Sequence, residues 1–394
     1  MKNDFVQPLN PSVTNMAVDG LTTFQNSVSN IEGIVRLTFG EPGFNVDDAV
    51  KNAIINSVED NNSHYSVAEG EPALRQAAVD YYNEKFGMNY AGIENVLVTS
   101  GVSEAIYDTF QTLLNIGDGI VIPEPAYPPY FAGIDLVHGT LVKVDTSKTN
   151  FKLTPESLTE ALQNSKVPVK AILFNYPSNP TGVTYSRAEL EALVEVFKEF
   201  KLWVISDEIY AELTYDEEHI SMVNLLPEQT ILITGLSKSH AMTGYRIGFI
   251  MGTTAFIEQA AKVHDTITFS LPKITQDGAT AALTLAKNAS DKMRDIYKRR
   301  RDFVAKKMTE FGFELVKPQG AFYIFAKIPA DFDSGDDGLK FAWELATEGG
   351  VGITPGISFS DSTADYVRVS YAASDDVLEI AMDRLEKWLA KKRA

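Results

Sequence analysis

Residues 201–238 read KLWVISDEIYAELTYDEEHISMVNLLPEQTILITGLSK and contain two apolar runs that each end abruptly in polar residues. WVIS runs directly into Asp207, and ILIT is followed shortly by Lys238. Strands buried on both faces of a parallel sheet read as short continuous apolar runs, and such sheets present ligand groups at the carboxyl ends of their strands. The stretch therefore predicts two buried strands with Asp207 and Lys238 at their C-terminal ends.

Similar apolar runs alternate with segments of helical periodicity on the N-terminal side of this stretch. They are ENVLVTSG (94–101), DGIVIPEP (118–125), GTLVKVD (139–145) and VKAILFNYPSN (169–179). This alternation predicts an α/β protein with a large, doubly wound and mostly parallel sheet.

A different pattern begins near residue 289. A charged helical stretch, 290–312, is followed by the strand-like segments GAFYIFAKI and YVRVSYAA and by a lysine-rich last helix. We interpret this part as a smaller α+β domain. The predicted organisation is an N-terminal arm with part of the small domain (1–45), a large domain (46–288) and a small C-terminal domain (289–394).

Composition excludes several classes of function. The 394 residues carry a net charge of −18, which argues against nucleic acid or an anionic membrane as a partner. The chain has no cysteine, and its five histidines show no HExxH or other close ligand spacing, so no metal site is predicted. Because no apolar run is long enough to cross a bilayer and no apolar leader opens the chain, we expect a cytoplasmic protein.

Four polar clusters fall at predicted strand ends, at 100–103, 175–182, 207–210 and 235–246. Taken singly, Lys238 reads as a surface lysine and Asp207 as a cap or turn residue. Taken jointly they lie in a set of strings that spans the chain: YSVAEGEPALR, VTSGVSEAI, PEPAYPPY, YPSNPTGV, SDEIYAEL, GLSKSHAMTGYRIGF, GAFYIF and YVRVSYA. Through this set the sequence resembles the fold-type I, class I and II aminotransferases over essentially its whole length. Within them it most resembles the bacterial aminotransferase A group, which includes N-acetyl-LL-diaminopimelate aminotransferases.

The resemblance implies pyridoxal 5′-phosphate (PLP) as the cofactor and Lys238 as the residue that holds it covalently. The same amine, once displaced by substrate, is suited to carry the proton that leaves Cα. Asp207 is implied as the carboxylate that keeps the pyridine nitrogen protonated. Asn179 and Tyr210 are implied as partners of the phenolic oxygen, although Asn179 also suits an Asn-Pro turn.

The resemblance also implies how the phosphate and the ring are held. Backbone amides at a helix N-terminus and a guanidinium suit a phosphate, and the matching residues are Gly101, Val102, Ser103, Ser237 and Arg246. Tyr65 would reach the phosphate of the neighbouring subunit, which implies a homodimer with shared active sites. Tyr127 would stack on the pyridine ring, although a tyrosine in a proline-rich turn suits core packing equally. Gly235 replaces a serine or threonine of many relatives, so one phosphate contact is expected to be lost or replaced.

For the substrate, the resemblance implies that Arg368 binds the α-carboxylate in a bidentate manner. The alternative is a strand arginine paired at the surface. Gly40 matches a position near that carboxylate, and Asn175 matches a position between the substrate and the ring. Asn179 is also expected among the substrate-binding residues.

The leading interpretation is a transaminase that moves an amino group from an L-amino acid to a 2-oxo acid such as 2-oxoglutarate in two half-reactions. The resemblance favours N-acetyl-LL-diaminopimelate as the donor, followed by aromatic or broad specificity. A PLP-dependent C–S β-lyase is the alternative within the same fold. A non-catalytic PLP-binding regulatory module is a more distant one, since the acidic chain begins without a DNA-binding segment.

Overall fold

The computed structural model describes residues 7, 9–14, 16, 20–332 and 337–394, so the predicted N-terminal arm lies partly outside the described residues. Its centre is a seven-stranded sheet in the order β2-β8-β7-β6-β5-β3-β4. All neighbouring strands in it are parallel except for the two pairs that β8 makes. The strands are β2 (Val96–Ser100), β3 (Gly119–Glu124), β4 (Thr140–Asp145), β5 (Val169–Asn175), β6 (Trp203–Asp207), β7 (Thr230–Gly235) and β8 (Ile247–Met251).

The α/β fold class and six of these strands are confirmed, whereas β8 was not predicted. Successive residues of the central strands pack on opposite faces of the sheet. Ile172 and Val204 join a cluster with the helices at 155–164 and 187–199, while Leu173 and Ile205 join one with the helices at 101–113, 129–136 and 254–267. Both faces are therefore buried, as the continuous apolar runs indicate.

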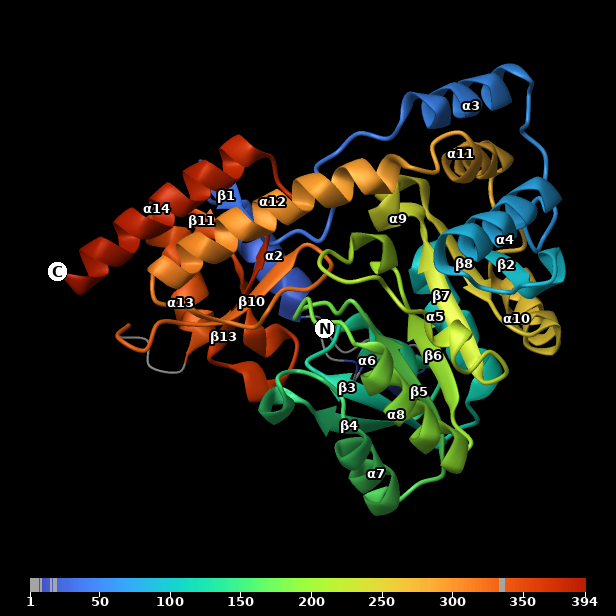
Figure 1. The fold of residues 1–394 in the computed structure, drawn as a ribbon, viewed down its shortest axis with the longest axis horizontal. Helices are drawn as coiled ribbons and strands as arrows, with labels where there is room; N and C mark the ends of the chain where they lie inside the picture. Colours follow the sequence, from blue (N-terminus) through green and yellow to red (C-terminus); the bar gives the residue numbers. More distant parts are fainter. Residues whose placement is uncertain (1–6, 8, 15, 17–19, 333–336) are drawn as a thin grey trace.

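Helices cover both faces of this sheet (Figure 1). They are α3 (Asp48–Glu59), α4 (Pro72–Phe86), α5 (Gly101–Leu113), α6 (Pro129–Leu136), α7 (Pro155–Asn164), α8 (Arg187–Glu199), α10 (Thr254–Ile267) and α11 (Lys273–Thr284). Among the described residues, no helix combines the length and the apolar character that a membrane span requires.

A second lobe carries a four-stranded antiparallel sheet in the order β12-β13-β10-β9. Strand β1 pairs in parallel with β11, so this lobe combines an N-terminal segment with the C-terminal part of the chain (Figure 1). The domain boundaries themselves stay a prediction. The elements of the lobe are α2 (Gly20–Ser29), β1 (Val35–Arg36), α12 (Ala289–Glu310), β9 (Glu314–Leu315), β10 (Tyr323–Lys327), α13 (Gly338–Glu344), β11 (Val351–Gly352), β12 (Thr354–Pro355), β13 (Tyr366–Ser370) and α14 (Asp375–Arg393), and the short helix α1 (Pro11–Thr14) precedes them.

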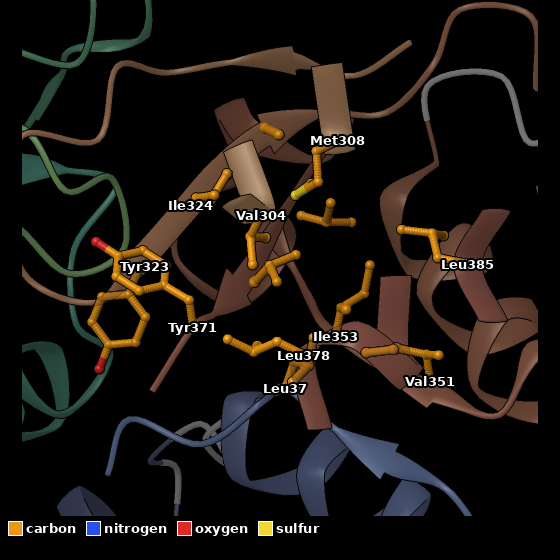
Figure 2. Packing of buried hydrophobic residues seen from close by; sticks show 14 of the residues in the cluster. Leu37, Val304, Met308, Tyr323, Ile324, Val351, Ile353, Tyr371, Leu378 and Leu385 are labelled. Carbon is orange, nitrogen blue, oxygen red and sulfur yellow. The ribbon is translucent and has the colours of Figure 1, made fainter. Parts of the chain in front are cut away.

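The core of this lobe joins α12, α14 and β10 through one cluster of apolar side chains. Figure 2 shows Val304 and Met308 of α12 facing the same interior as Leu378 of α14. The rings of Tyr323 and Tyr371 lie at the edge of the cluster with their hydroxyl groups turned away from the aliphatic side chains (Figure 2). The lobe thus brings a buried tyrosine hydroxyl, that of Tyr323, to its boundary with the large sheet.

Candidate active site

A cavity of about 450 Å³ lies where the carboxyl ends of β5, β6 and β7 face the second lobe. The sheet contributes the ends of three strands, as expected for an open α/β sheet, and the second lobe contributes β10 and β13. Every predicted site residue lines the cavity except Gly101 and Tyr65. Those that line it are Gly40, Val102, Ser103, Tyr127, Asn175, Asn179, Asp207, Tyr210, Ser237, Lys238, Arg246 and Arg368.

Lys238 lies in the short helix α9 (Leu236–Ser239) that follows β7. Its Nζ donates a hydrogen bond to the carbonyl oxygen of Gly40 at 2.6 Å. Burial lowers the pKa of Lys238 from 10.5 to about 8, with Arg246 and Arg368 adding to the effect and Glu41 opposing it. The amine is therefore neutral near neutral pH far more often than an ordinary lysine, as a nucleophile or base must be.

Asp207 ends β6 and is almost wholly buried. One carboxylate oxygen accepts from the Tyr130 hydroxyl at 2.6 Å and the other from the Ile209 backbone N–H at 3.1 Å. Burial raises the pKa of Asp207 to about 6 although both hydrogen bonds oppose the change. A carboxylate in this setting is stabilised by a protonated nitrogen brought beside it.

Arg368 lies in β13 with its side chain 1% exposed. Its two terminal nitrogens donate to Asn179 Oδ1 at 2.7 Å and to the Thr38 carbonyl at 2.8 Å, while its Nε has no partner. Within the described part of the chain, no ion pair includes this guanidinium. Burying a cation without a counter-charge is costly, so the arrangement favours binding of an anion. The alternative of a surface-paired strand arginine is wrong.

A chain of hydrogen bonds joins Asp207 to Arg368 across the cavity floor. The Asn175 side chain donates to the Asp207 carbonyl at 3.0 Å and accepts from the Asn179 N–H at 2.9 Å. Because Asn179 Oδ1 accepts from Arg368, the Asn179 amide Nδ2 remains as the donor end. The position of each amide is thus fixed by its neighbours.

Tyr210 follows β6 and shares a 2.8 Å hydrogen bond with the Tyr323 hydroxyl. Burial raises the pKa of Tyr210 well above its usual value, so the phenol stays protonated and can donate. The Tyr323 ring also faces the Arg368 guanidinium, 4.4 Å from the ring centre. The same tyrosine therefore supports two predicted site residues.

The turn into α5 lies against Arg246. Gly101 has φ of 75°, and a β-carbon there would lie 2.5 Å from Arg246 Nη2. A β-carbon at Gly248 on β8 would lie 2.5 Å from the carbonyl carbon of Gly101. The two glycines thus let backbone and guanidinium approach at the N-terminus of α5, an arrangement suited to a phosphate.

Gly235 has a packing explanation. A β-carbon at this position would lie 2.7 Å from the Ile247 carbonyl oxygen of the neighbouring strand β8. A serine or threonine side chain does not fit here without a shift of the strand pair.

Tyr65 lies outside the cavity and is 85% exposed. Its ring meets that of Phe269 edge to face at 4.9 Å. The predicted contact of Tyr65 with the phosphate in a neighbouring subunit therefore stays a prediction.

Sequence reasoning missed three side chains of the site. Tyr130, in PEPAYPPY, holds Asp207, and Tyr323, in GAFYIF, holds Tyr210. Glu41 accepts a hydrogen bond from Thr243 at the cavity wall and acts on the charge of Lys238. The strings that contain the two tyrosines were recognised, but a tyrosine beside apolar residues reads equally as core packing.

Comparison with known proteins gives consistent results. The family described as aminotransferase class I and II matches residues 32–385. The chain is 39% identical over 385 residues to a Bacillus subtilis protein described as a probable N-acetyl-LL-diaminopimelate aminotransferase, covering 98% of this chain and 96% of that protein. It is 36% identical over 364 residues to an aspartate aminotransferase of Geobacillus stearothermophilus, covering 90% and 91%.

A solved structure of similar fold is the aspartate aminotransferase from Thermus thermophilus with maleate. The two chains superpose with a TM-score of 0.89 at 31% sequence identity, over 97% of this chain and 100% of that one.

Proposed function

The chain belongs to the class I and II aminotransferases and is a PLP-dependent enzyme of fold type I, and from that premise we propose that the cavity around Lys238 is its active site. The observation that carries the proposal is one cavity that holds both an amine of lowered pKa and a buried guanidinium without a counter-charge. The comparisons favour the transaminase over the β-lyase and the regulatory module.

The residues present fit PLP. Asp207 offers a buried carboxylate for the ring nitrogen, and the Tyr210 hydroxyl and the Asn179 amide offer donors for the phenolic oxygen. The turn at Gly101, where α5 begins, and Arg246 would hold the phosphate. We propose Lys238 as the covalent attachment point.

When bound, PLP withdraws electrons from Cα of an attached amino acid and so makes the Cα proton acidic. Lys238 Nζ, whose pKa of about 8 leaves a substantial neutral fraction near that pH, accepts that proton. Arg368 holds the α-carboxylate through two parallel hydrogen bonds and so fixes the direction of the Cα–H bond. The Asn175 and Asn179 amides connect Asp207 to the Arg368 guanidinium through hydrogen bonds and so fix their relative positions.

For the amino donor we propose N-acetyl-LL-diaminopimelate, with 2-oxoglutarate as the acceptor. The support is the Bacillus subtilis relative, which aligns over nearly the whole chain. A donor with a neutral or aromatic side chain is a second candidate. Among the described residues, the cations of the cavity wall are Lys238, Arg246 and Arg368, and all three already have proposed roles. A second carboxylate on the substrate would need a cation from elsewhere.

We also propose a homodimer, which is typical of the family, and keep the cytoplasmic location as a prediction. The exposed Tyr65–Phe269 pair supports the dimer because aromatic side chains are enriched at protein interfaces.

Glutamate formation from 2-oxoglutarate over a panel of amino donors tests the function. The panel holds N-acetyl-LL-diaminopimelate, aspartate, phenylalanine and tyrosine, and pyruvate release from cystine is measured in parallel. We expect glutamate, with the acetylated donor giving the largest kcat/KM. Pyruvate without glutamate would contradict the transaminase, and a preference for phenylalanine would favour the second donor class.

Covalent attachment is tested separately. Borohydride treatment should fix the cofactor to wild-type protein, visible as a mass increase on the peptide that contains Lys238. Lys238→Ala should show neither the added mass nor turnover. Full turnover of that variant would contradict the proposed role.

A further inference from the structure

Three ionisable side chains meet between α5 and α10, outside the active-site cavity. Glu104 and Asp108 lie one turn apart on α5, and His264 lies on α10. His264 Nδ1 is 2.9 Å from a Glu104 oxygen and 3.9 Å from an Asp108 oxygen. One ligand atom from each residue lies within 4.8 Å of those of the other two.

Asp108 supplies an independent observation. Its side chain is 0% exposed, and both carboxylate oxygens lack a hydrogen-bond partner. A buried carboxylate in this condition carries the full cost of desolvation. One of its oxygens is directed at His264 Nδ1, so the unsatisfied group faces the other two.

The hydrogen bonds of His264 define which ring nitrogen is available. Its Nε2 is 2.9 Å from the Ala68 carbonyl oxygen, and because a carbonyl only accepts, Nε2 carries the proton. Without an ion, Nδ1 also carries a proton and donates it to the Glu104 carboxylate at 2.9 Å. A bound metal ion would displace that proton and take the Nδ1 lone pair. Metal-binding histidines usually donate their second N–H to a carbonyl or carboxylate in this way.

We propose that Glu104, Asp108 and His264 bind a divalent transition-metal ion, of which Mn²⁺ and Zn²⁺ are the best matches. One imidazole and two carboxylates suit these ions, whereas Mg²⁺ favours oxygen ligands and water. Two carboxylates also neutralise the charge of the ion. Ligand atoms about 2.1 Å from a common ion lie about 3.0 to 3.4 Å apart. The two His264 separations are 2.9 and 3.9 Å and all three ligand atoms lie within 4.8 Å, so binding requires the side chains to move closer together.

The proposed ion would join three segments near the active site. Glu104 also accepts hydrogen bonds from the Ser100 N–H, at the turn before α5, and from Thr268. The Ala68 carbonyl that holds His264 belongs to the loop after Tyr65. The ion would therefore stabilise the position of the proposed phosphate turn. It would take no part in the reaction, and the inference does not depend on the proposed substrate.

The test measures metal directly on the holoenzyme. Protein treated with EDTA and dialysed is equilibrated with Mn²⁺, Zn²⁺ or Mg²⁺, and bound metal is counted by mass spectrometry while unfolding temperature is recorded. We expect one Mn²⁺ or Zn²⁺ per wild-type chain and a higher unfolding temperature, with Mg²⁺ giving neither. Asp108→Asn keeps the shape and removes the charged ligand, and should bind at least about tenfold more weakly.

Two further variants make the result specific. Asp265→Asn makes the same change at the exposed neighbour of His264 and should bind metal as the wild type does. His264→Gln removes the nitrogen ligand and should lose binding even if Asp108→Asn folds poorly. Wild-type protein that binds neither ion, or binding that survives in both Asp108→Asn and His264→Gln, would overturn the proposal. None of these readouts requires transamination, so they are independent of the proposed function.

Discussion

The charge of one amine, that of Lys238, makes cofactor uptake depend on pH. With a pKa of about 8 in the folded protein, Nζ is mostly protonated below that pH and cannot attack an aldehyde. We expect the rate at which cofactor-free protein binds PLP covalently to rise about tenfold per pH unit up to pH 8 and then level off. Absorbance of the bound cofactor after mixing measures the rate. A rise that continues to pH 10, as for an ordinary lysine, would contradict the lowered pKa.

The Arg368 guanidinium differs from a lysine amine in the number and geometry of the hydrogen bonds that it can donate. Two of its nitrogens already donate to Asn179 and to the Thr38 carbonyl. Lys at this position keeps the charge but loses the planar pair of donors. We expect Arg368→Lys to lower kcat/KM roughly a hundredfold, mainly through a higher KM for the amino donor. Steady-state kinetics measure this, with Arg299→Lys on the exposed side of α12 as the matched control. Equal kcat/KM in the two variants would contradict the bidentate role.

The structure brings Lys238, Asp207 and Arg368 to one cavity, while their roles stay predictions. Arg368 could be singled out because a charge interrupts an apolar strand pattern. Lys238 and Asp207 were singled out only through the joint set of strings. Tyr130 and Tyr323 do not stand out in either way, because a tyrosine ring suits a core. Only the folded chain shows that their hydroxyls meet Asp207 and Tyr210.

Among the elements of the large sheet, β8 is the strand that the sequence analysis missed. A parallel neighbour to β7 would need a crossover connection of about a dozen residues, usually a helix packed on the sheet. Residues 236–246 between β7 and β8 instead hold α9 and a single further turn. The strand therefore returns antiparallel, and it lacks the polar carboxyl end that marked the other strands. Its first residues, IGF, were read as the end of the string GLSKSHAMTGYRIGF and not as a strand.

The close contact between β7 and β8 predicts that a hydroxyl side chain introduced at Gly235 lowers the stability of the fold. Gly235→Ser places its β-carbon 2.7 Å from the Ile247 carbonyl. We expect a loss of about 1 to 3 kcal/mol in the free energy of unfolding, measured by denaturant titration. Gly252→Ala is the matched control, because a β-carbon there meets its nearest atom at 3.7 Å, an ordinary contact. Unchanged stability of Gly235→Ser would show that β8 shifts freely.

At the scale of the whole molecule, the proposed active site combines distant parts of one chain. The large sheet supplies Lys238 and Asp207, the second lobe supplies Arg368, and the segment after β1 supplies Gly40. The alternating pattern predicted the sheet, but pairing of β1 with β11 joins segments more than three hundred residues apart and has no local signal. Two predicted cofactor residues do not line the cavity: Gly101 lies against Arg246, which does line it, whereas Tyr65 is exposed outside it.

This position makes the shared-site dimer testable by subunit exchange. Lys238→Ala and Tyr65→Ala should each be impaired as homodimers. In a mixed dimer, the cavity that keeps Lys238 would receive Tyr65 from the other chain and be complete. We expect the mixture to recover about a quarter of wild-type activity, because random exchange makes about half of the dimers hybrids and each hybrid has one complete site.

The control pairs Lys238→Ala with Arg246→Gln. Both residues line the same cavity of one chain, so no hybrid of these two variants has a complete site and activity should stay low. Exchange itself is followed by mass spectrometry of differently tagged chains. If hybrids form and Tyr65→Ala recovers no more activity than Arg246→Gln, Tyr65 does not act across the interface. Recovery with Tyr65→Ala alone would place an exposed tyrosine of one subunit in the active site of the other, which a single chain does not display.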